Sequence, residues 1–150
     1  MTAGGTALDP RRLAREVALQ MLYQWEIGGG ELAEVFDTYP RVRSSGLDAG
    51  HEAFAHALVR GTAERLAEID AIIDTHTANW RLERLAVVDR IVLRLAVYEM
   101  LARPDTPPLV AITEALELAR AFSGEAAVKF VNGVLDAVRR DLEARGRRTP

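Results

Sequence analysis

The chain has 150 residues, of which 49% are apolar and 27% are charged, as in a soluble globular domain with a sizeable core. It contains no cysteine, which excludes disulfides, thiolate metal sites and cysteine nucleophiles, and which fits a reducing cytoplasm. No apolar run approaches the roughly 20 residues that span a bilayer. We therefore expect a cytoplasmic protein with no membrane segment.

The formal net charge of −3 is unevenly distributed along the chain. Residues 1–15 carry three Arg against one Asp, a net +2, and residues 139–150 carry five Arg against one Asp and one Glu, a net +3. The remaining residues, 16–138, therefore carry a net −8. Two basic ends on an acidic body predict a patch that binds a polyanion and a body that suits a basic partner. Basic ends that serve only solubility are an equally open alternative.

Residues 1–8 lack the basic start and apolar stretch of a signal peptide and are expected to form a short disordered lead. Asp9 followed by Pro10 is typical of a helix start, with Asp as the N-cap and Pro at the first helical position. An apolar stripe over residues 13–25 predicts the helix itself, and three consecutive glycines end it.

Residues 32–39 form a short amphipathic segment that Pro40 is expected to end, and a loop follows. Asp48 is expected to cap a long third helix whose apolar stripe reaches His76, with a bend at Gly61.

Three further helices are predicted over residues 85–100, 109–122 and 125–144, separated by Pro and Gly clusters. No segment shows sustained period-two alternation. The sequence thus predicts an all-α domain over residues 9–144, built as a pair of packed helical bundles, with a basic tail at 145–150.

The segment 129–136 carries conflicting signals. Asn132-Gly133 between apolar residues is a strong hairpin signal, whereas Val131, Leu135 and Val138 keep helical spacing. We predict a helix. Gly133 would then allow a neighbouring helix to approach closely, and Asn132 would make a structural or ligand-side hydrogen bond.

The sequence does not indicate catalytic chemistry. His51, His56 and His76 lack a metal-binding spacing, and no phosphate-binding glycine loop or nucleophile elbow is present. We expect no metal site, no cofactor and no enzymatic activity.

Arg94 lies among apolar residues and needs a partner if it is buried. Glu114 of the next helix is a candidate, and a buried salt bridge between two helices is preferred over a ligand-binding role.

Arg11, Arg12 and Arg15 occupy the first turn and a half of a predicted helix, where the helix dipole disfavours cations. An RNA or DNA backbone would offset that cost. The alternative is that Arg is a good helix former and that the cost is small.

Four sequence motifs of this chain together resemble those of the NusB family. The resemblance covers residues 11–136, and the last of four motifs is the most specific. The motifs are Arg11-Arg12-x-Ala14-Arg15-Glu16-x-Ala18-x-Gln20-x-Leu22-Tyr23, Asp89-Arg90-x-Val92-Leu93-Arg94-x-Ala96-x-Tyr98-Glu99, Pro108-x-x-Ala111-Ile112-x-Glu114-Ala115-x-Glu117-Leu118-Ala119 and Lys129-Phe130-Val131-Asn132-Gly133-Val134-Leu135-Asp136.

The resemblance implies a non-enzymatic transcription antitermination factor of about seven helices. Such proteins pair with NusE, which is also a small-subunit ribosomal protein. The heterodimer binds the single-stranded boxA element of ribosomal RNA leaders and joins the antitermination complex of RNA polymerase. Some members also form homodimers that hide the RNA surface.

The resemblance also assigns residues. Arg11, Arg12 and Arg15 match the arginine-rich RNA-binding motif, and Lys129 and Phe130 match its C-terminal contribution, where a cation suits phosphate and an aromatic ring suits base stacking.

A second set matches positions that face NusE, where acids would meet a basic ribosomal protein. These residues are Tyr23, Glu83 and Asp89.

The chain departs from the family pattern at three positions. Leu13 stands where a third consecutive Arg is common, which predicts fewer phosphate contacts. Ala126 replaces an acid found in some members, and this change favours RNA binding. Thr113 replaces a common Asn near the start of its helix.

Two other functions fit the same composition. One is an accessory RNA-binding domain like those fused to RNA cytosine methyltransferases, although this chain has no Gly-rich loop and no catalytic Cys. The other is a purely structural helical homodimer.

Overall fold

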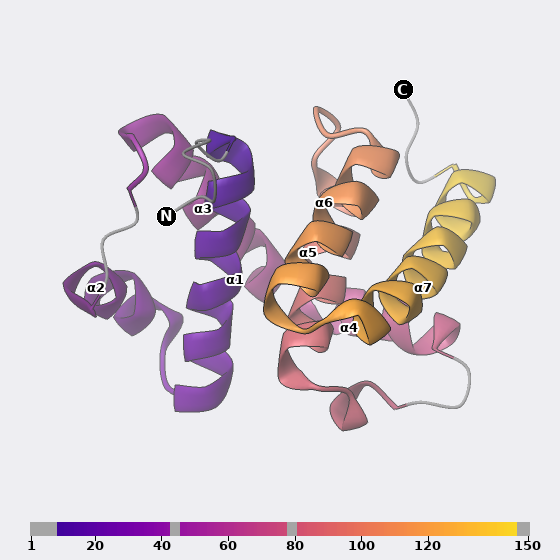
Figure 1. Cartoon of the computed structure of the whole chain (residues 1–150), viewed down its shortest axis with the longest axis horizontal. Helices are drawn as coiled ribbons and strands as arrows, with labels where there is room; N and C mark the ends of the chain where they lie inside the picture. Colours follow the sequence, from indigo (N-terminus) through magenta and orange to yellow (C-terminus); the bar gives the residue numbers. More distant parts are fainter. Residues whose placement is uncertain (1–8, 43–45, 78–80, 147–150) are drawn as a thin grey trace. The chain divides into compact units, whose positions relative to one another are not determined.

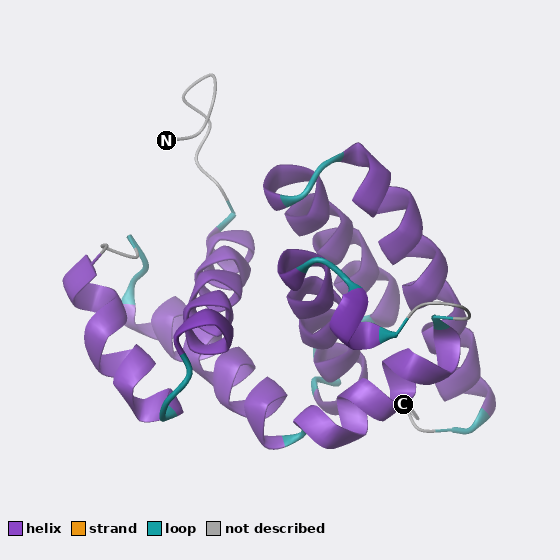
Figure 2. Ribbon diagram, turned by 90° about the horizontal axis from the view of Figure 1, so that it is seen from below, coloured by secondary structure: helices purple, strands orange, loops and turns teal. Residues whose placement is uncertain are grey.

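The computed structural model describes residues 9–42, 46–77 and 81–146. Every regular element in these ranges is helical, as Figure 2 shows, and the all-α prediction is confirmed. The elements are α1 (Pro10–Gly28), α2 (Leu32–Val42), α3 (Ala49–Glu64), α4 (Leu66–His76), the 3-10 helix η2 (Leu82–Arg84), α5 (Val87–Ala102), α6 (Pro108–Phe122) and α7 (Glu125–Ala144).

The chain forms two compact units, Met1–Arg60 and Gly61–Pro150, and the division falls inside α3. Unit 1 holds α1, α2 and most of α3, and unit 2 holds the remaining helices (Figure 1). The predicted pair of helical bundles agrees with this division. Within the described ranges, no helix is both long enough and apolar enough to cross a bilayer.

In unit 1, α1 packs against α2 through apolar side chains and two polar links. Gln24 Nε2 donates to Thr38 Oγ1 at 2.7 Å, and the Tyr39 hydroxyl donates to Gln20 Oε1 at 2.5 Å. Each link joins side chains of the two helices, so both fix the register of α2 on α1. The buried apolar residues of these two helices are Ala14, Val17, Ala18, Leu19, Met21, Leu22, Val35 and Tyr39.

Two predicted helix boundaries are wrong. Helix α2 continues two residues past Pro40, because a proline in the last turn removes only one helical hydrogen bond. The long third helix is in fact α3 and α4, which meet at Arg65, where φ is −108° and ψ is 21°. The predicted cap is confirmed, since Asp48 Oδ1 accepts a 2.8 Å hydrogen bond from the His51 backbone N–H.

Helix α5 is the centre of unit 2. It contacts α4, α6 and α7, and ten of its residues are buried. A helix that is covered on nearly every side has no solvent face for its polar side chains, so these must find partners within the protein.

Arg94 of α5 is held by an ion pair with α4. Its Nε and Nη2 donate to the two carboxylate oxygens of Asp70 at 2.8 Å and 2.9 Å. The Arg94 side chain is 12% exposed and that of Asp70 is 27% exposed. A structural salt bridge between helices was predicted at Arg94, and the one shown uses Asp70, which the sequence analysis did not name.

Gly61 of α3 lies in close contact with Tyr98 of α5. A Cβ atom built on Gly61 would overlap Cζ and the hydroxyl oxygen of Tyr98 in α5. Only a residue without a side chain fits there, because the Tyr98 ring occupies the space that a methyl group would need.

We expect Gly61→Ala to destabilise the protein by about 1–3 kcal/mol through overpacking against Tyr98. Urea unfolding measures the change. In Gly61→Ala/Tyr98→Leu the smaller side chain leaves room for the methyl group, so the two effects should not add. Strict additivity, or no loss in the single variant, would contradict the close contact.

Breaking the Arg94–Asp70 pair should lower the free energy of unfolding by about 1.5–3 kcal/mol, since both charges lose bidentate, partly buried hydrogen bonds. A double-mutant cycle with Arg94→Met and Asp70→Asn measures the coupling. The matched control is the exposed Arg145–Asp141 pair, for which we expect less than about 0.5 kcal/mol. Equal coupling in the two cycles would contradict a structural role for Arg94.

Candidate nucleic-acid interface and partner surface

The start of α1 presents three arginines from a capped helix end. Asp9 Oδ1 accepts hydrogen bonds from the backbone N–H groups of Arg11 and Arg12 at 2.8 Å and 3.3 Å. The first turn contains no acidic residue. The cap thus fixes the backbone while the arginine side chains raise the positive potential of the helix N-terminus.

Phe54 of α3 supports two of these arginines. The Arg11 guanidinium carbon lies 4.4 Å from the centre of the Phe54 ring, and that of Arg15 lies 5.5 Å from it. Stacking uses the flat face of a guanidinium, whereas its N–H donors point outward from the edge of the plane. The Phe54 ring therefore lies within cation–π distance of Arg11, and such a contact uses none of the N–H donors that bind phosphate.

The three arginines differ in exposure. Arg11 is exposed and Arg12 is half-buried, but Arg15 is only 5% exposed. In this arrangement Arg15 has little surface to offer to a ligand, and its guanidinium lies close to the same Phe54 ring as that of Arg11. Sequence reasoning missed Phe54, because its place in an apolar stripe gives no sign of an arginine above it.

A carboxylate also lies within this part of α1. Burial raises the pKa of Glu16, and the positive charge of Arg12 partly opposes that rise. The arginine-rich start of the helix therefore carries a carboxyl group that gives up its proton less readily than an exposed one.

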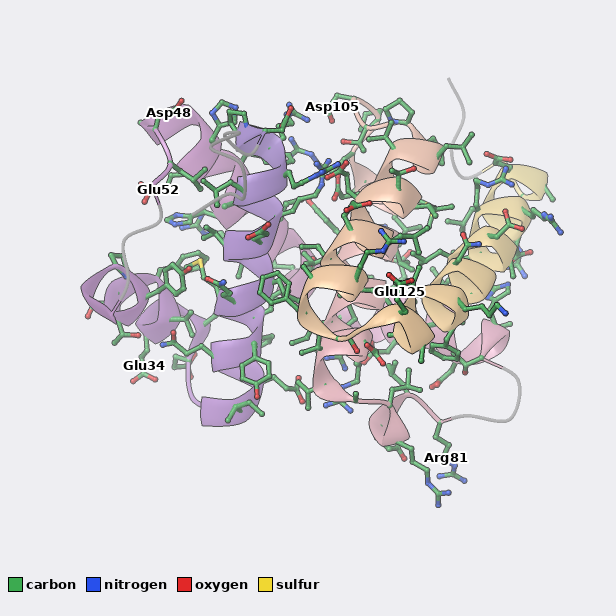
Figure 3. All side chains as sticks on the ribbon, in the orientation of Figure 1. Glu34, Asp48, Glu52, Arg81, Asp105 and Glu125 are labelled. Atoms are coloured by element: carbon green, nitrogen blue, oxygen red, sulfur yellow. The ribbon has the colours of Figure 1, made fainter. Side chains whose placement is uncertain are left out.

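Lys129 and Phe130 lie in α7, one turn after its first residue, Glu125, which is labelled in Figure 3. Lys129 is exposed and has no ion-pair partner among the described residues, while Phe130 is half-buried and Val131 is fully buried. The structure thus brings a cation and a partly exposed aromatic ring together in one helical turn.

Asn132 and Gly133 lie in the interior of a regular α7, so the helix prediction is confirmed. The prediction that Gly133 admits a neighbouring helix is wrong, because a Cβ atom there would meet nothing within 4 Å. Both residues are exposed, and no described residue forms a hydrogen bond with the Asn132 side chain. Relative to Ala, Gly costs about 1 kcal/mol and Asn up to about 0.7 kcal/mol in a helix interior.

The residues expected to face a protein partner lie at three places. Tyr23 of α1 is 44% exposed, and Glu83 of η2 is exposed. Asp89, in the first turn of α5, is half-buried, and its Oδ1 is buried without a hydrogen-bond partner among the described residues.

Arg90 fixes the short helix that carries Glu83. Its Nη1 donates to the carbonyl oxygens of Leu82 and Glu83 at 3.4 Å and 3.2 Å. Arg90 is 9% exposed, so its charge is directed inward to the backbone of η2. Arg81, just before η2, extends outward (Figure 3).

The described ranges contain no group of three or more metal-ligating side chains that could hold an ion. Both ring nitrogens of His76 make contacts within the protein. Its Nδ1 lies 2.8 Å from the Ile72 carbonyl oxygen, and its Nε2 lies 3.5 Å from Asp141 Oδ2.

Comparison with known proteins identifies the family. The sequence model of the NusB family matches residues 12–140. The chain belongs to the NusB family. It is 50% identical over 132 residues to the transcription antitermination protein NusB of Solibacter usitatus, covering 88% of this chain and 90% of that protein. It is 43% identical over 139 residues to NusB of Geobacter sulfurreducens, covering 93% and 100%.

Solved structures agree with this assignment. NusB of T. maritima has a TM-score of 0.80 and 36% identity, covering 90% of this chain and 94% of that one. A structure of the antitermination factors NusB and NusE in complex with dsRNA contains a chain with a TM-score of 0.79 and 30% identity, covering 90% and 99%. The predicted family is confirmed, and these relatives are named as antitermination factors rather than as enzymes.

We expect Phe54→Leu to weaken RNA binding, because it removes the ring face that orients Arg11 while keeping an apolar side chain of similar size. The free energy of unfolding should fall by less than about 1.5 kcal/mol. Phe54→Tyr, which retains the ring, is the control. Fluorescence anisotropy and urea unfolding separate the two effects, and equal RNA affinity for Phe54→Leu and Phe54→Tyr would contradict the supporting role.

Proposed function

We propose that the chain is a transcription antitermination factor that binds the boxA element of ribosomal RNA leader transcripts as a heterodimer with the ribosomal protein NusE. The observation that carries the proposal is its likeness to a NusB chain solved with NusE and RNA, at 30% identity over 90% of this chain. In this role the protein joins the RNA polymerase antitermination complex in the cytoplasm and supports transcription of ribosomal RNA.

The proposed RNA contacts are of two kinds. Arg11, Arg12 and Lys129 supply cations to phosphates, and Phe130 supplies a ring edge or face to an unpaired base. Arg15 belongs to the same proposed RNA-binding motif, although it is only 5% exposed and its guanidinium lies near the Phe54 ring that Arg11 also contacts. An aromatic residue beside a cation favours single-stranded RNA, whose bases are open to stacking.

The proposed NusE contacts are Tyr23, Glu83 and Asp89. Glu83 is an exposed carboxylate, and Tyr23 combines an exposed ring with a hydroxyl group, as is common in protein interfaces. The acidic middle of the chain supports a basic partner such as a ribosomal protein, through faster and more selective association.

The direct test is fluorescence anisotropy with labelled boxA RNA, a scrambled single strand and a duplex, each with and without NusE. We expect NusE to raise the affinity for boxA, and boxA to bind more tightly than either control. If NusE neither binds nor raises RNA affinity, the proposed function is wrong. Mass determination in solution distinguishes the heterodimer from a homodimer that excludes both ligands.

Two charge variants should separate the two surfaces. Arg11→Gln should weaken RNA binding and make the slope of log affinity against log salt shallower by about 0.7, the value for one lost phosphate contact to a single strand. Its affinity for NusE should stay unchanged. Glu83→Lys should weaken NusE binding and leave the RNA salt slope of the free chain within error. An Arg11→Gln protein with an unchanged salt slope would contradict the assignment.

A further inference from the structure

Among the residues that the structure describes, no packing contact or backbone conformation explains the exposed Asn132-Gly133 step in α7. Gly133 is in a regular helix without a positive φ, and a methyl group on it would contact nothing within 4 Å. Neither a special backbone conformation nor helix packing requires glycine there, in contrast to Gly61. The helix therefore carries two adjacent, weakly helix-forming residues at positions where a better helix former would fit.

These two residues share an exposed face of α7 with Lys129. Residues three and four positions apart lie one above the other on a helix, so Asn132 and Gly133 both neighbour Lys129. Ala126, one turn earlier, is also small and exposed. We call Ala126, Lys129, Asn132 and Gly133 the α7 strip.

The acids at the two ends of the α7 strip are each paired with an arginine, although Arg120, the partner of Glu125, also pairs with Glu117 of α6. Glu125 Oε2 accepts a 2.8 Å hydrogen bond from Arg120 Nε of α6. Asp136 is paired with both Arg139 and Arg140 at 2.8 Å, and the hydrogen bond from Arg139 lowers the pKa of Asp136. Lys129 has no ion-pair partner among the described residues, so this face offers an unpaired cation to a phosphate group.

We propose that one nucleotide of the bound RNA lies directly on the bare backbone of Gly133, with its base edge hydrogen-bonded by the Asn132 amide and an adjoining phosphate contacted by Lys129. This inference rests on the RNA-binding function proposed above and adds a base-reading position to it. The absence of a side chain at Gly133 lets the sugar or base approach the helix more closely than any other residue would.

The amide of Asn132 has the chemistry that this position needs. It offers donors and an acceptor at once, so it pairs with a base edge that presents both, such as the N6 and N7 of adenine. Phosphate oxygens, by contrast, only accept. Asn132 therefore contributes to the choice of base, whereas Lys129 contributes to affinity for any sequence.

The test is to measure RNA affinity and stability together for Gly133→Ala and Asn132→Ala, in the presence of NusE. For Gly133→Ala we expect RNA affinity to fall about tenfold while the melting temperature rises, because the added methyl favours the helix but blocks the nucleotide. For Asn132→Ala we expect a loss of about fivefold, confined to RNAs that carry the preferred base, and no loss of stability.

Gly28→Ala is the matched control, since a Cβ on Gly28 at the end of α1 also meets nothing within 4 Å. Its RNA affinity should equal that of the wild type. If both α7 variants bind RNA within twofold of the wild type while Lys129→Ala binds weakly, the base-reading position is wrong and the proposed function stands. If the wild type itself fails to bind RNA with NusE, both are wrong.

Discussion

The burial of α5 on nearly every side is the constraint on which unit 2 depends. A helix with almost no solvent face cannot hydrate its long polar side chains, so these depend on partners in neighbouring segments. Arg94 is satisfied by Asp70 of α4, and Arg90 by the carbonyl groups of η2. Tyr98 lies against Gly61, where α3 has no side chain. Three neighbouring segments are thereby fixed to one buried helix.

Both candidate surfaces in unit 2 depend on this arrangement. Arg90 holds the backbone of η2, and so sets where Glu83 is presented. Helix α7 packs on α5 and α6 through its apolar face, which leaves the opposite face with Lys129 exposed. In unit 1, the buried Phe54 ring lies under the guanidinium of Arg11, an exposed residue at the start of α1. Arg90 and Phe54 are thus buried residues that each contact a segment or side chain at the surface.

Helical periodicity was enough to predict the all-α class and most helix positions, and side-chain chemistry was enough to predict the caps at Asp9 and Asp48. Contacts between distant parts of the sequence were not predictable in the same way. The pattern around Arg94 required a partner but could not select Asp70, which lies 24 positions earlier. The burial of Arg15 depends on how the helices pack, and no local pattern reports that.

Two of the helical glycines, Gly61 and Gly133, also show that long-range contacts could not be predicted from the sequence. Sequence reasoning gave Gly133 a packing role, because Gly in a helix interior calls for compensation. The structure gives the packing role to Gly61, since only there does a neighbouring ring lie where a Cβ atom would be. Gly133 is exposed to solvent, so helix packing does not explain why a glycine stands there.

We propose that RNA and NusE contact different residues of this protein. Hydrogen–deuterium exchange of the chain alone, with NusE, and with NusE and boxA RNA tests this proposal. We predict that NusE slows exchange around η2 and the start of α5. RNA should then slow exchange at the start of α1 and at residues 129–133 of α7. Protection by RNA of the η2 segment alone, with α1 and α7 unchanged, would contradict the account.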